Sequence, residues 1–358
     1  MSWPEDFAAD ITAETERDAP LAPLTSLRVG GPARLLVRPW TLAGLAQAVS
    51  WLRRRGVSWR ILGGGTNLVV PDEGFDGAIV RMEGELAGFS WGGLTLTAGA
   101  GARLPRVLGE CVRRGASGLE CLAGIPGTVG GALLMNAGGR WGEISDHVRS
   151  VLVLREGGGS GGAEAGAGKV PVRELRVLGG RAQEGGSPRK GPGDAAAEPG
   201  GLSQAGSRDA VSLEAGAGPP QEEDRSDSAA TFGYRSSSLA GEVVVGAVFE
   251  LEEAPPGEVR ERARSVIEGR RAGQPLGARS AGCIFRNPPD APPAGRLLDE
   301  AGMKGRRRGG AVVSQLHANF VVNEGSATAA DVLGLIREMR EAVLSRFGVD
   351  LSPEVELW

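Results

Sequence analysis

Two stretches of small residues have the composition of loops that bind an anion through their backbone. The three glycines at 63–65 follow a strand-like run and lead into Thr66, Asn67 and Leu68. Consecutive glycines let several backbone N–H groups converge on one anion, and a diphosphate is the natural guest. The run matches neither GxGxxG before a helix nor GxxxxGKS/T, which argues against an ordinary Rossmann or P-loop site. For this stretch alone, a glycine-rich hairpin turn is an equally good interpretation.

A second small-residue stretch spans residues 118–132 and continues through 135–139. It reads GLECLAGIPGTVGGA and then MNAGG, which is too long and too varied for a single turn. Small residues permit close backbone packing along a flat ligand. Together with the run AGAG at 98–101, these stretches look like loops that line one elongated cofactor.

Strand and helix patterns alternate around these loops. Strands are expected at 33–39, 58–62, 77–82, 94–101, 148–156, 170–178 and 242–251. Helices are expected over 42–55, 104–114, 258–271 and 329–347. The last helix begins at a capping box of Thr328 and Asp331 and ends before Gly348. The pattern predicts a mixed α+β chain.

The charge and composition exclude several classes of protein. The chain has 358 residues, with 44 acidic against 40 basic, so it is neither a polycationic nucleic-acid binder nor a polyanionic tail. Three widely spaced cysteines and two distant histidines argue against a zinc site. The N-terminus lacks a signal-peptide pattern, and no apolar run reaches about eighteen residues. We therefore expect a soluble, cytoplasmic protein with no metal and no membrane insertion.

Residues 156–230 differ in composition from the rest of the chain. They are rich in Gly, Glu, Ser, Pro and Ala and contain no aromatic residue. A segment of this kind cannot bury enough apolar surface to form a core. Apart from the strand expected at 170–178, we predict that most of it is a disordered insertion.

Eight blocks of sequence, in order, resemble the UDP-N-acetylenolpyruvoylglucosamine reductases. They are LGGGTNLVV, AGAG, GLECLAGIPGTVGGALLMNAG, FGYRSSS, SAGCIFRNP, AGRLLDEAGMKG, LHANFVVN and LSPEVELW. The resemblance extends from about Thr25 to Trp358 except for the insertion. The short interval between Tyr234 and Cys283 is similar to the family's shorter form, which lacks an additional substrate-gripping loop.

The resemblance implies an α+β flavoenzyme of peptidoglycan precursor synthesis. It implies a two-part FAD-binding region of the vanillyl-alcohol-oxidase (PCMH) type at 1–80 and 81–254, a substrate-binding domain at 255–350, and a tail at 351–358 that returns to the active site. NADPH would reduce the noncovalently bound FAD. The reduced flavin would then pass a hydride to C3 of UDP-N-acetylglucosamine-enolpyruvate, and a protein acid would protonate C2 to give UDP-N-acetylmuramate. We expect a monomer.

The resemblance also assigns roles residue by residue. The implied FAD-binding positions are Gly63, Gly64, Gly65, Thr66, Asn67, Leu68, Gly99, Gly124, Gly127, Thr128, Gly130 and Gly131. The implied substrate-binding positions are Tyr234, Asn287, Lys304, His317 and Asn319. The implied catalytic positions are Arg235, Cys283 and Glu354.

The catalytic positions have residue types that suit this chemistry. Hydride addition places negative charge on the enolpyruvyl carboxylate, and the Arg235 guanidinium can bind that charge in bidentate fashion without losing its proton. A thiol with an ordinary pKa of about 8.5 is still protonated near neutral pH, so Cys283 can donate a proton to carbon. Many relatives have Ser at this position. Glu354 could assist proton delivery or orient the substrate.

Other interpretations remain open for several of these residues. A cysteine such as Cys283 is often a small buried residue, and Tyr234 with Arg235 could be a surface pair at a strand edge. The basic run at 306–308 is usually a solvated loop, although beside Lys304 it could attract a diphosphate. For the whole chain, the alternatives are an FAD-dependent oxidase of the same fold acting on a hydroxy acid or alcohol, and a noncatalytic UDP-sugar-binding regulator.

Overall fold

The computed structural model describes residues 3, 6–7, 11–155, 170–177 and 229–358. The predicted insertion at 156–230 lies mostly outside these residues. Within it, the expected strand is confirmed as β12 (Val172–Val177), and β13 (Ala229–Ala230) lies beside it in parallel.

The N-terminal sheet consists of four strands in the order β1-β2-β5-β3. Their bounds are β1 (Ala13–Pro20), β2 (Pro32–Pro39), β5 (Phe75–Val80) and β3 (Trp59–Ile61). One face packs on α1 (Leu42–Arg54), which begins where the Thr41 hydroxyl accepts a hydrogen bond from the Gly44 backbone N–H at 3.1 Å. The opposite face contributes Leu36 and Ile79 to a separate small core.

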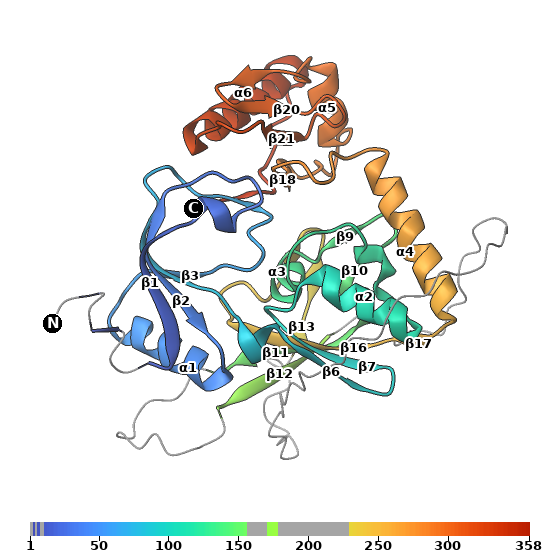
Figure 1. The fold of residues 1–358 in the computed structure, drawn as a ribbon. Coiled ribbons are helices and arrows are strands. Elements are labelled where there is room, and N and C mark those ends of the chain that lie inside the picture. Colours follow the sequence, from blue (N-terminus) through green and yellow to red (C-terminus); the bar gives the residue numbers. More distant parts are fainter. Residues whose placement is uncertain (1–2, 4–5, 8–10, 156–169, 178–228) are drawn as a thin grey trace.

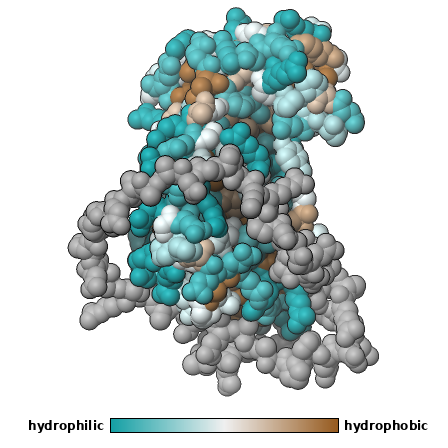
Figure 2. All heavy atoms as spheres, turned by 90° about the vertical axis from the view of Figure 1, so that its right-hand side faces the viewer, coloured by the Kyte–Doolittle hydropathy of each residue, from teal (hydrophilic) through white to brown (hydrophobic). Residues whose placement is uncertain are grey.

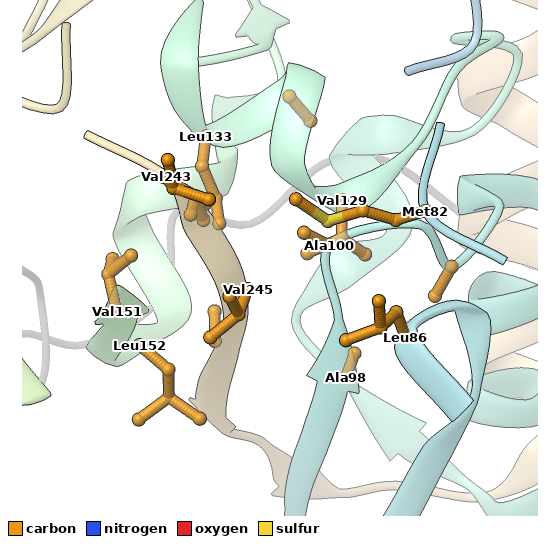
Figure 3. Close-up of a cluster of buried hydrophobic side chains, with 14 of the residues drawn as sticks. Met82, Leu86, Ala98, Ala100, Val129, Leu133, Val151, Leu152, Val243 and Val245 are labelled. Atoms are coloured by element: carbon orange, nitrogen blue, oxygen red, sulfur yellow. The ribbon is translucent and has the colours of Figure 1, made fainter. Parts of the chain in front are cut away.

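The central sheet consists of six strands in the order β13-β12-β11-β16-β7-β6. The strands not yet given are β11 (Val148–Leu154), β16 (Val244–Glu250), β7 (Thr95–Gly99) and β6 (Phe89–Gly92). Figure 3 shows how Met82 and Leu86, from the segment that follows the N-terminal sheet, approach Ala98 and Ala100 near β7. These residues and the α1 face of the N-terminal sheet belong to one continuous hydrophobic core, which fixes the two sheets relative to each other.

The C-terminal sheet consists of four strands in the order β18-β21-β20-β19. The bounds are β18 (Ser280–Cys283), β21 (Phe320–Asn323), β20 (Ala311–Val313) and β19 (Arg307–Arg308), with α5 (Ala294–Glu300) and α6 (Ala329–Phe347) packed against them. The capping box predicted at Thr328 and Asp331 is present, and Gly348 ends α6 with φ of 69°. The core of this unit is built around α6, and it also takes in Leu27, Val29 and Val69 of the N-terminal unit.

The helix α4 (Pro256–Arg271) joins the central unit to the C-terminal unit (Figure 1). It buries only Val259, Ala263, Val266 and Arg270. Its outer side carries ion pairs one helical turn apart, such as Arg264 with Glu268. Figure 2 views the molecule from this side, and the coloured part of the surface there is mainly hydrophilic with scattered apolar patches.

The remaining elements are short. They are η2 (Ala22–Leu24), β4 (Leu68–Val69), η3 (Gly84–Ala87), α2 (Leu104–Arg114), β8 (Ala116–Ser117), η4 (Leu119–Leu122), α3 (Val129–Leu134), β9 (Gly138–Gly139), β10 (Gly142–Glu143), η5 (Ile144–His147), β14 (Phe232–Gly233), β15 (Ser236–Ser237), β17 (Glu252–Glu253) and β22 (Glu356–Leu357). All four predicted helices are confirmed, whereas β1, α3 and α5 were not predicted. Within the described part of the chain, no helix is both long and apolar enough to cross a membrane.

The C-terminal unit is attached to loops of the N-terminal unit as well as to α4. Asp72 accepts hydrogen bonds from the backbone N–H groups of Ala329 and Ala330 at 2.8 and 2.9 Å, so it caps α6 from another unit. At the end of the chain, β22 pairs in parallel with β4, and the tail therefore lies beside the loop that contains the three glycines. Figure 1 shows the C-terminus next to the N-terminal unit.

Candidate active site

A cavity of about 440 Å³ lies where the units meet. All eight residues predicted to be catalytic or substrate-binding line its wall: Tyr234, Arg235, Cys283, Asn287, Lys304, His317, Asn319 and Glu354. The other lining residues are Gln274, Phe285, Pro293, Gly295, Arg296, Asp299, Leu316 and Ala318. Segments that are far apart in the sequence therefore meet at one place.

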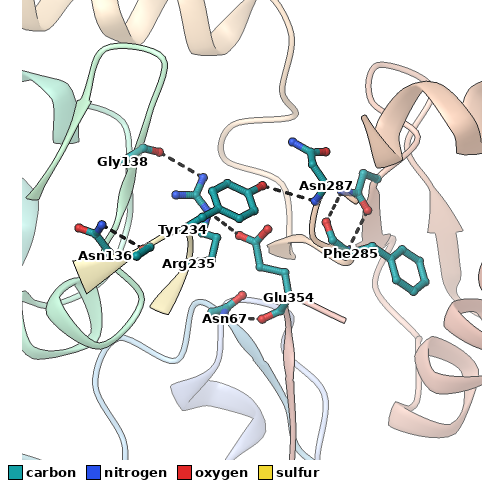
Figure 4. A network of polar contacts seen from close by, with 10 residues as sticks. Asn67, Asn136, Gly138, Tyr234, Arg235, Phe285, Asn287 and Glu354 are labelled. Carbon is teal, nitrogen blue, oxygen red and sulfur yellow. Dashed lines mark hydrogen bonds and ion pairs between the residues drawn. The ribbon is translucent and has the colours of Figure 1, made fainter. Parts of the chain in front are cut away.

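The two-residue turn between β14 and β15 presents Tyr234 and Arg235 to this cavity. Arg235 has φ of 52°, a backbone conformation that costs free energy in a residue with a side chain. Its Nε donates to Glu354 Oε1 at 2.9 Å and its Nη2 to the Gly138 carbonyl at 3.3 Å, as Figure 4 shows. Among the described residues, Nη1 has no hydrogen-bond partner, so one edge of the guanidinium can bind an anion.

The C-terminal tail places Glu354 opposite Arg235. The Glu354 backbone N–H donates to the Ile284 carbonyl at 2.7 Å, and its carbonyl accepts from Asn67 Nδ2 at 3.1 Å (Figure 4). The side chain is 13% exposed. Burial raises the pKa of the Glu354 carboxyl, and the positive charge of Arg235 opposes that rise.

Cys283 lies at the end of β18, next to a bulge in its pairing with β21. Gly282 has φ of 80° at this bulge, which turns the strand toward the cavity. Burial, and then the negative charge of Glu354, raise the pKa of the Cys283 thiol to about 12, while Arg235 lowers it. The thiol therefore stays protonated at neutral pH, but it is a weaker acid than the ordinary thiol that the sequence suggested.

Two asparagines in the wall hold the backbone in place. Asn319 accepts from the Phe285 N–H at 2.9 Å and donates to the Phe285 carbonyl at 2.8 Å. The Asn287 side-chain oxygen accepts from the Ala294 backbone N–H at 3.0 Å. The Asn287 backbone N–H donates to the Tyr234 hydroxyl oxygen at 3.4 Å. The Asn319 side chain is thus engaged with the segment that follows Cys283, and it has little capacity left for a ligand.

Charged side chains of the C-terminal unit occupy another part of the wall. Lys304 Nζ donates to Asp299 Oδ2 at 2.6 Å. His317 accepts the Asn319 N–H at its Nδ1 at 3.2 Å, and burial, followed by Lys304, lowers the pKa of its imidazole. A neutral His317 agrees with a role in the pocket wall and not with a role as a charged donor. The neighbouring basic run is solvated, because Arg307 and Arg308 form exposed ion pairs with Glu324 and Glu338.

The glycine loop at 63–67 offers free backbone donors. Within the described residues, none of its five N–H groups donates a hydrogen bond to the protein. The loop crosses the second small-residue stretch so closely that a Cβ on Gly64 would lie 2.5 Å from Gly127 Cα, and one on Gly63 2.6 Å from Thr128 Oγ1. Thr128 Oγ1 is itself buried without a partner. The two stretches therefore bring unpaired donors together on one surface, as a bound anion requires.

Other predicted cofactor positions have structural explanations within the protein. The Gly99 N–H donates to the Gly88 carbonyl, and a Cβ at Gly99 would lie 2.2 Å from the Leu86 carbonyl oxygen. The Gly130 N–H donates to the Ala100 carbonyl at 2.8 Å. These two glycines permit close backbone packing, and their N–H groups are not free. Leu68 is buried in β4. A Cβ on Gly131 would lie 3.7 Å from Thr128 Oγ1, which is an ordinary van der Waals distance.

Eight lining residues were not predicted, and three of these belong to one block. Gly295, Arg296 and Asp299 lie in AGRLLDEAGMKG, which includes α5. The block was recognised as part of the resemblance, but only Lys304 was selected from it. The charged residues of this block were the sequence signal that could have indicated its other lining residues. Gln274 was missed because no sequence feature connects the end of α4 with the cavity.

Comparisons with known proteins agree with this arrangement. The family model described as UDP-N-acetylenolpyruvoylglucosamine reductase, C-terminal domain, matches residues 274–358, and one described as FAD binding domain matches residues 33–160. A UDP-N-acetylenolpyruvoylglucosamine reductase of Anaeromyxobacter dehalogenans is 38% identical, covering 100% of this chain and 89% of the relative. The chain belongs to the UDP-N-acetylenolpyruvoylglucosamine reductase family.

Two further relatives support the same family. The protein of that name from Geobacter metallireducens is 35% identical over 98% of this chain and 95% of the relative. The crystal structure of the family's enzyme from Thermus caldophilus has a TM-score of 0.68 and 33% identity, covering 97% of this chain and 99% of that one. The predicted fold class, α+β with an FAD-binding region and a C-terminal α+β substrate domain, is confirmed.

The residues present fit FAD. The FAD-binding match at 33–160 contains both small-residue stretches that bring the unpaired donors together. A dinucleotide carries a diphosphate, and the free N–H groups at 63–67 with the unpaired Thr128 hydroxyl supply donors for it.

Proposed function

We propose that this protein reduces UDP-N-acetylglucosamine-enolpyruvate to UDP-N-acetylmuramate with NADPH, through FAD. One observation carries the proposal: a single cavity collects Arg235, Glu354 and Cys283 from three separate segments, beside the loop that offers free N–H donors. An oxidase of a small alcohol has no evident use for this set. A noncatalytic regulator has no use for a proton donor.

FAD, when bound, supplies the hydride chemistry. The residues at 63–67 and Thr128 would hold its diphosphate, and the Gly64–Gly127 crossing would set the depth of that surface. Gly99, Gly124, Gly130 and Gly131 would shape the surrounding backbone.

Arg235 binds the carboxylate of the substrate in this proposal. Its pairing with Glu354 and the Gly138 carbonyl fixes the guanidinium plane and leaves Nη1 for the ligand. Negative charge that develops on the carboxylate is then met by a positive charge already in position.

Cys283 donates the proton to C2 of the substrate. Its raised pKa keeps the proton on Sγ until a strong base, the enolate-like carbon, needs it. Glu354, whose pKa is also raised, lies beside Arg235 and can restore the proton to the thiol. Lys304 and the charged wall around it would hold the substrate diphosphate, with Tyr234, Asn287, His317 and Asn319 completing the wall.

The organisation around this activity is part of the proposal. We place the unit boundaries near residues 80, 254 and 350, because each of the three larger sheets lies within one of these intervals. We also propose that the protein is cytoplasmic and monomeric.

Anaerobic spectroscopy of the purified protein tests the function. The protein should be yellow, should bleach with NADPH, and should regain its colour when UDP-N-acetylglucosamine-enolpyruvate is added. Bleaching by simple hydroxy acids or alcohols, with no recovery on adding the UDP-sugar, would overturn the proposal in favour of an oxidase.

A further inference from the structure

Arg270, near the end of α4, is a buried cation with an unsatisfied donor. It is 7% exposed, although most arginines lie at the surface. Its Nη2 donates to the Cys121 carbonyl at 2.9 Å, and its Nε is buried with no hydrogen-bond partner in the described structure. A buried donor on a charged group is costly when it is left unpaired.

No carboxylate balances this charge within the described residues. The ionisable groups that act on Arg270 are the Cys121 thiol, whose pKa burial raises to about 12 so that it stays uncharged at neutral pH, and two cations, Arg235 and Arg140. Arg270 and Arg140 both contact the Trp141 ring, with their guanidinium carbons 5.1 and 4.1 Å from its centroid. The ring orients the Arg270 guanidinium but does not neutralise it. A buried cation of this kind needs an anion from outside the chain.

The position of Arg270 points to the reacting part of the cofactor. Gly124 leaves room for it, since a Cβ there would lie 3.3 Å from Arg270 Cδ. Cys121 and Gly124 belong to the stretch that reaches the crossing at Gly127, and the chain that follows α4 places Gln274 in the cavity wall. Arg270 therefore contacts the stretch that would help to hold FAD, and it lies near enough to Arg235 in the cavity wall for the two positive charges to interact.

We propose that Arg270 binds the anionic form of the reduced flavin ring and thereby raises its reduction potential. The inference rests on the proposed function only in that FAD is the cofactor. NADPH transfers two electrons and one proton as hydride, so NADPH becomes NADP⁺ and the neutral flavin becomes a singly negative reduced flavin. The buried guanidinium stabilises that charge, which is absent from the oxidised ring.

Redox titration of the holoprotein and of Arg270→Met tests this inference. We expect Arg270→Met to weaken binding of reduced FAD at least tenfold more than binding of oxidised FAD. For a two-electron couple, tenfold corresponds to a midpoint potential lower by about 30 mV. Arg270→Lys should retain most of the wild-type potential, and the matched control Arg140→Met, on the exposed side of the same ring, should leave it unchanged. An unchanged potential in Arg270→Met, with or without weaker FAD binding, would overturn the inference.

A measurement on the wild-type holoprotein decides the matter even if Arg270→Met does not fold. A reduced flavin that stays anionic takes up one proton with two electrons, so its potential should fall by about 30 mV per pH unit from pH 6 to 8. A slope of about 60 mV would mean that the reduced ring is neutral, and it would overturn the inference. Neither titration contains the UDP-sugar. The titrations can therefore overturn this inference without bearing on the proposed reaction, and the proposed reaction can fail without changing their result.

Discussion

The glycine loop at 63–67 and the cavity wall offer opposite kinds of contact to a ligand. The loop offers backbone N–H groups, and its glycines pack so closely on the stretch at 127–128 that no side chain fits. The wall offers side chains, including Arg235, Cys283 and Glu354, from segments that meet only in the fold. Substitutions in the two regions should therefore fail differently. Those in the loop should lose the cofactor, and those in the wall should lose turnover while the cofactor stays bound.

Gly64→Val should have the largest effect, because the new Cβ would lie 2.5 Å from the Gly127 backbone. The backbone of neither stretch can move without disturbing the N–H groups that face the anion. We expect a folded protein that purifies without flavin, measured by the absorbance ratio of flavin to protein. As a matched control, Gly92→Val adds the same side chain where nothing lies within 4 Å, and it should retain the flavin. Stoichiometric FAD in Gly64→Val would refute the loop assignment.

Asn67→Ala sharpens the comparison because Asn67 belongs to both regions. Its backbone lies in the loop of free donors, and its side chain donates to the Glu354 carbonyl at 3.1 Å. Loss of one such bond costs about 0.5–1.5 kcal/mol, so kcat/KM should fall by about two- to tenfold. FAD affinity, measured by fluorescence titration, should change little. A large loss of FAD with normal turnover of the remaining holoprotein would show that the side chain serves the cofactor instead.

The smallest expected effect is on stability, where Glu354→Gln should change how the free energy of unfolding depends on pH. Burial raises the pKa of Glu354 in the folded state, so the folded protein binds this proton more tightly than the unfolded chain does. Wild type consequently loses stability as pH rises from about 4 through the folded pKa, and the Gln variant lacks this loss. The free energy of unfolding of Glu354→Gln minus that of wild type should increase between about pH 4 and 7. The exposed control Glu356→Gln should show no such trend, and a decrease for Glu354→Gln would contradict the prediction.

Local signals in the sequence predicted many of the elements. The capping box at Thr328 and the glycine at 348 delimit α6, and Gly115 ends α2 in the left-handed conformation. These ends depend on neighbouring residues in the chain, so sequence patterns can predict them. The strand β1 was missed because it is a mostly exposed edge strand with the polar sequence AETERDAP. The helix α3 was missed because two of its six residues are glycines, and its place depends on packing against Ala100.

The site was predicted from sequence blocks that resemble a known family, and not from the local properties of its residues. Tyr234, Cys283 and Glu354 carry no pattern that connects them, and the pairing of β22 with β4 joins segments that are far apart in the sequence. The raised pKa of Cys283 depends on burial, which the sequence does not contain. Arg270 was likewise taken as part of a helix end, because its unpaired Nε is visible only in three dimensions.

The two half-reactions of Cys283→Ala, followed in a stopped-flow spectrometer, test most directly whether chemistry belongs to the wall and the cofactor to the loop. Reduction of the flavin by NADPH needs no protein acid, so the variant should bind FAD and bleach at nearly the wild-type rate. Reoxidation by UDP-N-acetylglucosamine-enolpyruvate needs the proton from Cys283, so it should slow by about 10²- to 10⁴-fold, and Cys283→Ser should recover much of it. Rapid reoxidation of the alanine variant by the substrate would contradict the account and would leave Glu354 as the better proton donor.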